Sequence, residues 1–335
     1  MTNSLTNSLT PSIQLDHKFS VAPMLDWTDR HCRYFLRLIS QHSVLYTEMI
    51  TTGAIIYGDT HHHLQMNPLE HPVALQLGGS DPTDLAKACV LASKYDYAEI
   101  NLNCGCPSDR VQNGMFGAVM MKNAKITADC IAAMQDAVDL PITVKHRIGV
   151  DDFDSYEFLC EFVDTVAKSG CETFLVHARK AWLKGLSPKQ NREVPELNYE
   201  RVYQLKKDFP QLEIIINGGV TTLAQSLDHL NHIDGVMVGR EAYTNPYLLA
   251  SVDQQIYGSE QPVIGREKIA EAFLDYVDNE LAKGTKLQSM TRHILGLFHG
   301  MPGARQYRRH ISENAYKPDA TIDVLTNALA KTTGL

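Results

Sequence analysis

Short apolar runs rich in β-branched residues alternate with helical patterns from residue 19 to residue 240, and this alternation limits the possible folds more than any other feature. Such alternation is typical of parallel strands linked by helices. The strand-like runs are residues 19–22, 44–47, 73–77, 97–101, 142–146, 173–177, 213–217 and 235–239. Eight runs, each followed by a connection, predict an α/β fold closed as a (β/α)8 TIM barrel. An open doubly wound sheet would usually carry a G-x-G-x-x-G turn after its first strand, which this sequence lacks.

The segments between these runs, and the segment after them, have helical patterns. Helices are predicted at residues 29–41, 82–95, 127–138, 153–168, 199–208 and 222–231. After about residue 245 the strand signals stop, and apolar residues recur at helical spacing within 269–281, 294–298 and 322–329. We therefore predict a disordered tail at 1–15, a barrel at 16–255 and a small C-terminal helical bundle domain at 260–335.

Cysteine content, hydropathy and charge indicate the compartment and the class of partner. Seven cysteines without a disulfide-like framework are typical of a reducing compartment. No apolar run approaches the ~20 residues of a membrane span, and residues 1–11 lack the regions of a secretory signal. These features predict a cytoplasmic protein without a membrane partner, which we expect to be a monomer. The net charge of −8 argues against indiscriminate coating of nucleic acid, but residues 265–335 carry ten Lys or Arg against eight Asp or Glu.

The C-terminal strand ends are the place for an active site in a barrel of this type. The first predicted strand is followed by Pro23, Met24 and Leu25, and polar residues or glycines end or follow later strands at Gln76, Asn101, Lys145, His177, Asn217, Gly218, Gly219, Gly239 and Arg240. Loops after strands seven and eight commonly bind phosphate through backbone N–H groups, and a lysine suits the anionic ring of a reduced flavin. Taken singly, each residue could be structural, as a tight turn, an ion pair or a core histidine. Taken together, they predict an FMN site.

The segment after strand four carries two cysteines, Cys104 and Cys106, on a predicted loop. A C-x-C spacing is poor for a tetrahedral metal site, and a disulfide between these residues would be strained, so no metal is expected. A cysteine thiol with an ordinary pKa of about 8.5 is mostly protonated at neutral pH and can act as a general acid. Reduction of an electron-poor C=C bond needs a hydride at one carbon and a proton at the other. A thiol above the flavin would supply that proton.

Six ordered motifs resemble the tRNA-dihydrouridine synthase family, in its bacterial A-type branch. They lie at residues 22–29, 101–108, 144–147, 176–179, 217–220 and 238–240, and the resemblance extends over residues 19–329. It implies that Cys106, and not Cys104, is the proton donor. It implies FMN contacts at Pro23, Met24, Leu25, Gln76, Lys145, His177, Asn217, Gly218, Gly219, Gly239 and Arg240. It also implies electrons from NADPH, or NADH, and reduction of uridines 20 and 20a in the D loop of tRNA.

Two basic segments are candidates for contact with tRNA. Residues 181–192 form a connection after strand six that is too long and basic for a simple link. Arg305, Arg308 and Arg309 lie within five residues and would concentrate positive charge on a helix. The resemblance implies tRNA contacts at Asn103, Lys189, Arg192, Arg305 and Arg308, to which we add Arg309. A solvated helix face is the alternative explanation of the arginine cluster.

Two other functions fit parts of the sequence. An FMN barrel could act on a free pyrimidine, as dihydroorotate and dihydropyrimidine dehydrogenases do, although such an enzyme needs no RNA-facing helical domain. The chain could also be a non-catalytic tRNA-binding factor. His61, His62 and His63 are consecutive and would diverge in direction, so they are not expected to bind metal. Trp27 could stack on a base or simply pack, and the sequence does not decide between these.

Overall fold

The computed structural model describes residues 15–108, 111–112 and 114–332. Eight parallel strands close into a barrel in chain order, with β8 hydrogen-bonded to β1. The strands are β1 (Phe19–Val21), β2 (Val44–Thr51), β3 (Val73–Gly78), β4 (Glu99–Cys104), β5 (Ile142–Arg147), β6 (Thr173–His177), β7 (Glu213–Asn217) and β8 (Gly235–Val238). The predicted (β/α)8 barrel is confirmed. The predicted disordered tail lies, except for its last residue, outside the described residues.

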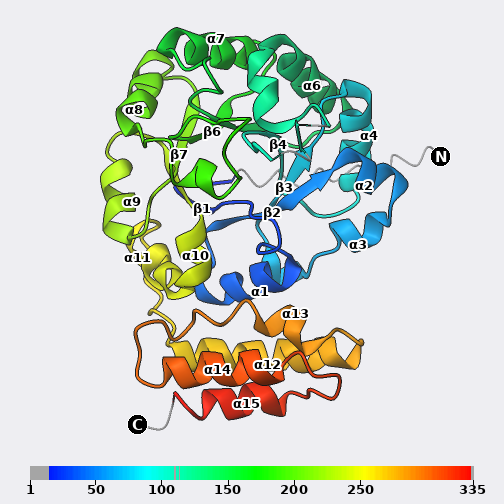
Figure 1. The fold of residues 1–335 in the computed structure, drawn as a ribbon, viewed down its shortest axis with the longest axis vertical. Coiled ribbons are helices and arrows are strands. Elements are labelled where there is room, and N and C mark those ends of the chain that lie inside the picture. Colours follow the sequence, from blue (N-terminus) through cyan, green and yellow to red (C-terminus); the bar gives the residue numbers. More distant parts are fainter. Residues whose placement is uncertain (1–14, 109–110, 113, 333–335) are drawn as a thin grey trace, which may run out of the picture.

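Helices surround the barrel on all sides (Figure 1). They are α1 (Arg30–Ile39), α4 (Pro82–Ala92), α6 (Ala124–Ala137), α7 (Tyr156–Ala167), α8 (Tyr199–Asp208), α9 (Leu223–His229), α10 (Arg240–Thr244) and α11 (Val252–Gln255). Several begin at a side chain that accepts a backbone N–H, such as Asp29 before α1, Asp81 before α4 and Ser155 before α7. The connection between β2 and β3, which the sequence left unassigned, contains α2 (Thr52–Tyr57), α3 (Thr60–Leu64) and the 3-10 turn Pro68–Glu70. Three further 3-10 turns are Gly117–Lys122, Gln190–Arg192 and Pro246–Ser251.

Strand residues alternate between the barrel interior and the helical layer, because successive side chains of a strand point to opposite faces. Tyr46, Leu175, Ile215 and Met237 pack together inside the barrel. The larger apolar core lies between the strands and the surrounding helices. Inward positions therefore present side chains either to this small interior core or, near the strand ends, to the mouth of the barrel.

Four helices follow the barrel, and in Figure 1 they lie beside α1 and α10. They are α12 (Arg266–Ala282), α13 (Leu287–Thr291), α14 (Ala304–Asn314) and α15 (Asp323–Leu329). The predicted helix at 294–298 is wrong, since these residues form turns closed by i to i−3 hydrogen bonds such as Leu297 N–H to Ile294 O. A side chain at Gly296 would collide with Thr244 O of the barrel, so close packing against the barrel accounts for the glycine there. The apolar residues of the stretch are buried nevertheless.

Charged contacts fix the helical bundle to the connection between β1 and α1. The Asp29 carboxylate accepts hydrogen bonds from Arg292 Nη2 at 2.6 Å and from His293 Nε2 at 3.0 Å. Arg30 Nη2 donates to Glu280 at 2.6 Å. Asp29 also caps α1, so one carboxylate organises both the barrel helix and the bundle that docks on it. Within the described residues, no helix is both long enough and apolar enough to cross a membrane.

Candidate active site

Four strands extend further than the sequence predicts. β2 ends at Thr51, β3 at Gly78, β4 at Cys104 and β5 at Arg147, so Gln76, Asn101 and Lys145 lie within strands and do not end them. Asn101 is fully buried in the interior. The predicted strands were too short because polar residues such as Glu48, Asn103 and Arg147 interrupt the apolar runs. Their polar side chains nevertheless find partners inside the barrel or at its mouth.

Residues of β5, β6, β7 and β8 meet at the mouth. Lys145 Nζ on β5 donates to Asn217 Oδ1 on β7 at 3.0 Å, and Asn217 Nδ2 donates to Met237 O on β8 at 2.8 Å. His177 at the end of β6 lies against Gly218, where an added Cβ would sit 2.8 Å from His177 Cδ2. Three of the predicted FMN residues are therefore in one cluster, with Gly218 beside it.

Glycine backbone forms the rim beside this cluster. Gly218 and Gly219 have φ values of 120° and 73°, which side chains disfavour, and Tyr199 Oη donates to Gly218 O at 2.8 Å. Gly239 differs, because an added Cβ would meet only Ala22 Cβ, at 3.9 Å. The protein's own packing thus leaves open space over Gly239. A phosphate approaching the backbone would fit such a surface.

Positive charge dominates the mouth. Burial, and then the neighbouring Arg147, lower the pKa of Lys145 to about 7. Burial also holds the pKa of His177 well below its usual value, with Arg147 and Lys145 adding to the effect. Arg192 stands near enough to Cys106 and Arg240 for charge interactions, and Arg240 forms an exposed ion pair with Glu193 at 2.6 Å. Cations that depress the pKa values of their neighbours indicate a site suited to an anionic ligand.

Hydrogen bonds with several neighbouring segments hold the backbone of the loop that carries Cys106. Backbone N–H groups of Gly105 and Cys106 donate to Asn103 Oδ1 at 3.2 and 3.0 Å. Arg147 Nε donates to Gly105 O at 2.8 Å, and Ala118 N–H donates to Cys106 O at 2.9 Å. The Cys106 thiol is half-buried and lies 3.5 Å from Ser108 Oγ. The loop backbone is therefore fixed while the thiol stays accessible.

Cys104 occupies a different environment from Cys106. It is the last residue of β4, not a loop residue as predicted, and it is fully buried in the core between strands and helices. Burial raises the pKa of its thiol far above the usual value. Cys104 is thus inaccessible to a ligand, whereas the Cys106 thiol is accessible.

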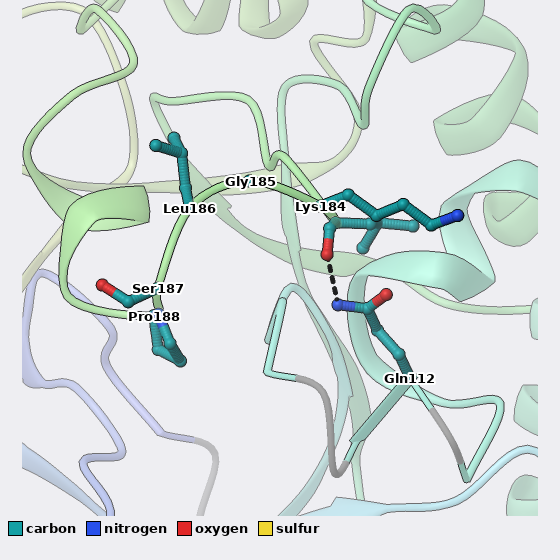
Figure 2. A pocket seen from close by; sticks show the side chains of 7 residues that line it. Gln112, Lys184, Gly185, Leu186, Ser187 and Pro188 are labelled. Atoms are coloured by element: carbon teal, nitrogen blue, oxygen red, sulfur yellow. Dashed lines mark hydrogen bonds between the residues drawn. The ribbon is translucent and has the colours of Figure 1, made fainter.

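The long connection after β6 is an ordered loop above the mouth. The buried Asn191 side chain receives Trp182 N–H at 2.8 Å and donates to Trp182 O at 2.8 Å and to Leu186 O at 3.2 Å. Gln112 Nε2 donates to Pro107 O at 2.8 Å and to Leu183 O at 2.7 Å, which ties this loop to the Cys106 loop. Figure 2 shows Gln112 reaching the loop at the edge of a hollow of about 670 Å³.

The predicted tRNA residues occupy three separate places. Lys189 and Arg192 are exposed on the loop after β6. Arg305 and Arg308 are exposed on α14, one turn apart, whereas Arg309 pairs with Glu313 at 2.7 Å. Asn103 is buried at the mouth, where its amide is engaged with Gln76 and the Cys106 loop. The structure therefore does not bring these predicted contacts into one cluster.

The sequence analysis did not single out several residues that organise the site. Arg147 belongs to a motif used for the resemblance, yet its three backbone acceptors, Gly105 O, Lys180 O and Asn191 O, lie 33 to 44 residues away in the chain. No sequence signal identified Asn191 or Gln112. The Trp27 ring stacks on Tyr243 with centroids 4.4 Å apart. Across the described residues, no group of three or more His, Cys, Asp or Glu side chains could hold a metal ion, the three exposed histidines 61–63 included.

Comparison with known proteins agrees with this geometry. The family model described as Dihydrouridine synthase (Dus) matches residues 20–333. A protein of Vibrio vulnificus named tRNA-dihydrouridine(20/20a) synthase is 62% identical over 315 residues, covering 94% of this chain and 96% of its own. Proteins of the same name from Yersinia pestis and Escherichia coli K12 are 60% and 61% identical, covering 98% and 93% of this chain and 96% and 90% of their own. The chain belongs to the dihydrouridine synthase family.

Proposed function

We propose that this protein reduces uridines 20 and 20a in the D loop of tRNA to dihydrouridine. One observation carries the proposal. At the mouth of the barrel, an accessible Cys106 on a loop held by hydrogen bonds lies beside a cationic cluster suited to an anionic cofactor. Arg147 Nε donates to Gly105 O next to Cys106 at 2.8 Å, and Lys145 pairs with Asn103 across β5 and β4, which supports treating the two features as one site. Membership in the dihydrouridine synthase family and the names of the similar proteins support the substrate.

The donor set at the mouth fits FMN. Lys145 would stabilise negative charge on the ring, and Gln76 would bond the ring edge. Backbone at Gly218, Gly219 and Gly239, with Arg240, would hold the phosphate. The remaining proposed contacts are Pro23, Met24, Leu25, His177 and Asn217. When bound and reduced by NADPH, this cofactor would supply a hydride to the uracil ring.

Cys106 would complete the reduction as the general acid. Its thiol would give a proton to the carbon of the 5,6 double bond that does not receive the hydride, and the resulting thiolate would be reprotonated from solvent. Asn103 Oδ1 accepts from the loop N–H groups, and Arg147 and Ala118 donate to the loop carbonyls, which keeps the loop backbone in place during this transfer. A fixed acid avoids the cost of ordering the loop at each turnover.

The uridine must leave its stacked position to reach this thiol, as bases do in other enzymes that act on them. We propose that Asn103, Lys189 and Arg192 contact tRNA near the mouth, and that Arg305, Arg308 and Arg309 contact it on the helical bundle. We also propose that the protein acts as a cytoplasmic monomer. The seven free cysteines are compatible with that reducing compartment.

Transient kinetics of a Cys106→Ala variant test the proposal. The variant should slow reoxidation of the reduced cofactor by tRNA roughly 100-fold or more, because it lacks the acid, while reduction by NADPH should change little. A Cys160→Ala variant, altered at a half-buried cysteine on α7, serves as the control. Unchanged reoxidation in Cys106→Ala would contradict the role of the thiol. Purified protein that shows no flavin absorbance near roughly 375 and 450 nm after incubation with FMN and removal of the unbound cofactor would contradict the cofactor.

A further inference from the structure

A line of buried side-chain hydrogen bonds runs through the barrel interior to the Cys106 loop. Thr143 Oγ1 donates to Glu99 Oε1 at 2.6 Å, and Asn101 Nδ2 donates to Thr143 Oγ1 at 2.8 Å. Gln76 Nε2 donates to Asn101 Oδ1 at 2.8 Å, and Asn103 Nδ2 donates to Gln76 Oε1 at 2.9 Å. We call these five residues the polar ladder. It ends where Asn103 Oδ1 accepts the backbone N–H groups of the Cys106 loop.

Strand register builds the polar ladder. Gln76, Asn101 and Thr143 are paired across β3, β4 and β5, so they form one layer of the interior. Glu99 and Asn103 stand two residues before and after Asn101 on β4, and they point inward with it. The ladder therefore crosses three strands and three layers, and it connects the closed end of the barrel with the mouth.

Every hydrogen bond of the polar ladder points in the same direction. A carboxylate can only accept, so Glu99 makes Thr143 a donor and leaves the Thr143 oxygen to accept from Asn101. A backbone N–H can only donate, so the Cys106 loop requires the oxygen of the Asn103 amide. Fixed groups at both ends thus leave one consistent orientation for the three amides between them.

Burial makes this orientation costly to change. The five side chains are between 0% and 8% exposed, so water is not a ready replacement partner. Flipping one side-chain amide would place two donors or two acceptors opposite each other. The buried groups left without a hydrogen bond would each cost about 1–3 kcal/mol of stability. A substitution at one end of the polar ladder therefore affects the hydrogen bonds along its whole length.

Charged and polar groups hold the base of the ladder. His17 Nε2 lies 2.7 Å from Glu99 Oε2, and Tyr46 Oη donates to Glu99 Oε1 at 2.9 Å. Burial alone would lower the pKa of His17, but Glu99 and Glu213 outweigh it and raise the pKa to about 10. An imidazolium between two carboxylates keeps Glu99 in place as an acceptor.

We propose that the polar ladder positions Cys106, with Glu99, Thr143 and Asn101 as positioning residues that act through Asn103. The inference rests on the proposed role of Cys106 as the proton donor. None of these three side chains needs to touch substrate or cofactor. They determine which end of the Asn103 amide faces the loop, and the oxygen of that amide holds the backbone of Cys106 itself.

Thr143→Val tests the ladder at its centre. Valine has the shape of threonine but no hydroxyl, so Asn101 loses its acceptor and Glu99 loses a donor. Thr143→Ser restores the hydroxyl, and Thr291→Val makes the same isosteric change at a fully buried threonine of the helical bundle. We expect Thr143→Val to slow tRNA-dependent cofactor reoxidation roughly 10- to 100-fold, with little change in reduction by NADPH. Thr143→Ser and Thr291→Val should both remain near the wild-type rate.

Hydrogen exchange gives a readout that does not depend on activity. In cofactor-free protein, Thr143→Val should speed exchange of the Gly105 and Cys106 amides, and Thr143→Ser and Thr291→Val should not. Wild-type exchange of these amides in Thr143→Val, or wild-type reoxidation, would overturn the inference. If Cys106→Ala leaves reoxidation unchanged, the proposed function fails instead, and the exchange rates alone still decide whether the ladder holds the loop.

Discussion

Lys145 is a half-buried lysine at the mouth whose pKa falls to about 7 through burial and then through Arg147. At pH 8 it is therefore mostly neutral in the cofactor-free protein. An anionic ring bound beside it would favour the charged form and raise this pKa again. We predict that FMN binding at pH 8 takes up protons, with Lys145 as the main group that receives them.

Calorimetry in buffers of different ionisation enthalpy measures this uptake. The apparent binding enthalpy should vary with the buffer for the wild-type protein, and a Lys145→Met variant should lose most of the variation. Lys206→Met, at a lysine that pairs with Asp234 on the far side of β7, should retain it. A buffer-independent enthalpy for wild-type protein would contradict the expected position of the cofactor beside Lys145.

At the scale of elements, Asp29 links α1 with the helical bundle. Its carboxylate caps α1 through the N–H groups of His31 and Cys32 and also binds Arg292 and His293. Burial opposes the charged form, but His293, Cys32 and Arg292 outweigh it and hold the pKa of Asp29 well below its usual value. This carboxylate therefore contributes to stability at neutral pH, and the contribution is lost as the pH falls toward that lowered pKa.

Two substitutions separate the roles of Asp29. Asn caps helices about as well as Asp, so Asp29→Asn should weaken only the docking contacts and cost about 1–3 kcal/mol. Asp29→Ala should cost about 1 kcal/mol more because it also removes the cap. Urea unfolding of both variants measures the difference. Equal free energies of unfolding in the two variants would show that the cap contributes nothing.

The elements of the barrel could largely be predicted from sequence, and their ends could not. The strands contain short apolar runs that can be recognised locally in the sequence, as in Ile142 to Val144 of β5. The same strand continues through Lys145 and Arg147, and polar residues read as a strand's end. They remain in the strand because their side chains form hydrogen bonds with residues of other elements, such as the bond from Lys145 to Asn217 on β7. The 294–298 stretch has apolar residues at helical spacing but forms turns, with Gly296 packed against Thr244 O of the barrel.

For the whole molecule, binding of tRNA should depend on two distant basic surfaces. Arg305→Ala and Arg308→Ala should each weaken binding and reduce the slope of log affinity against log salt by somewhat less than one, as loss of one phosphate contact would. Lys125→Ala, at an exposed lysine on the barrel helix α6, is the control and should change neither quantity. Fluorescence titrations at several salt concentrations measure both. Unaltered slopes in the two arginine variants would contradict contact between α14 and tRNA.

Many residues of the site could be predicted from the sequence, but the contacts that bring them together could not. Strand ends and glycines indicated the mouth from sequence, and the motifs identified the family. The contacts that organise the mouth join residues far apart in the chain, such as Gln112 with Leu183 and Arg147 with Asn191. An isolated asparagine or glutamine carries no sequence signal for such a role, because the same residue on a surface would only meet water.

The central claim is that this protein, through Cys106, makes the dihydrouridine at positions 20 and 20a. Mapping dihydrouridine in tRNA from a gene-deletion strain complemented with wild-type or Cys106→Ala protein tests it most directly. We predict that both positions carry uridine in the deletion strain, that the wild-type gene restores dihydrouridine, and that Cys106→Ala does not. Dihydrouridine that persists at both positions in the deletion strain, or full restoration by Cys106→Ala, would contradict the account.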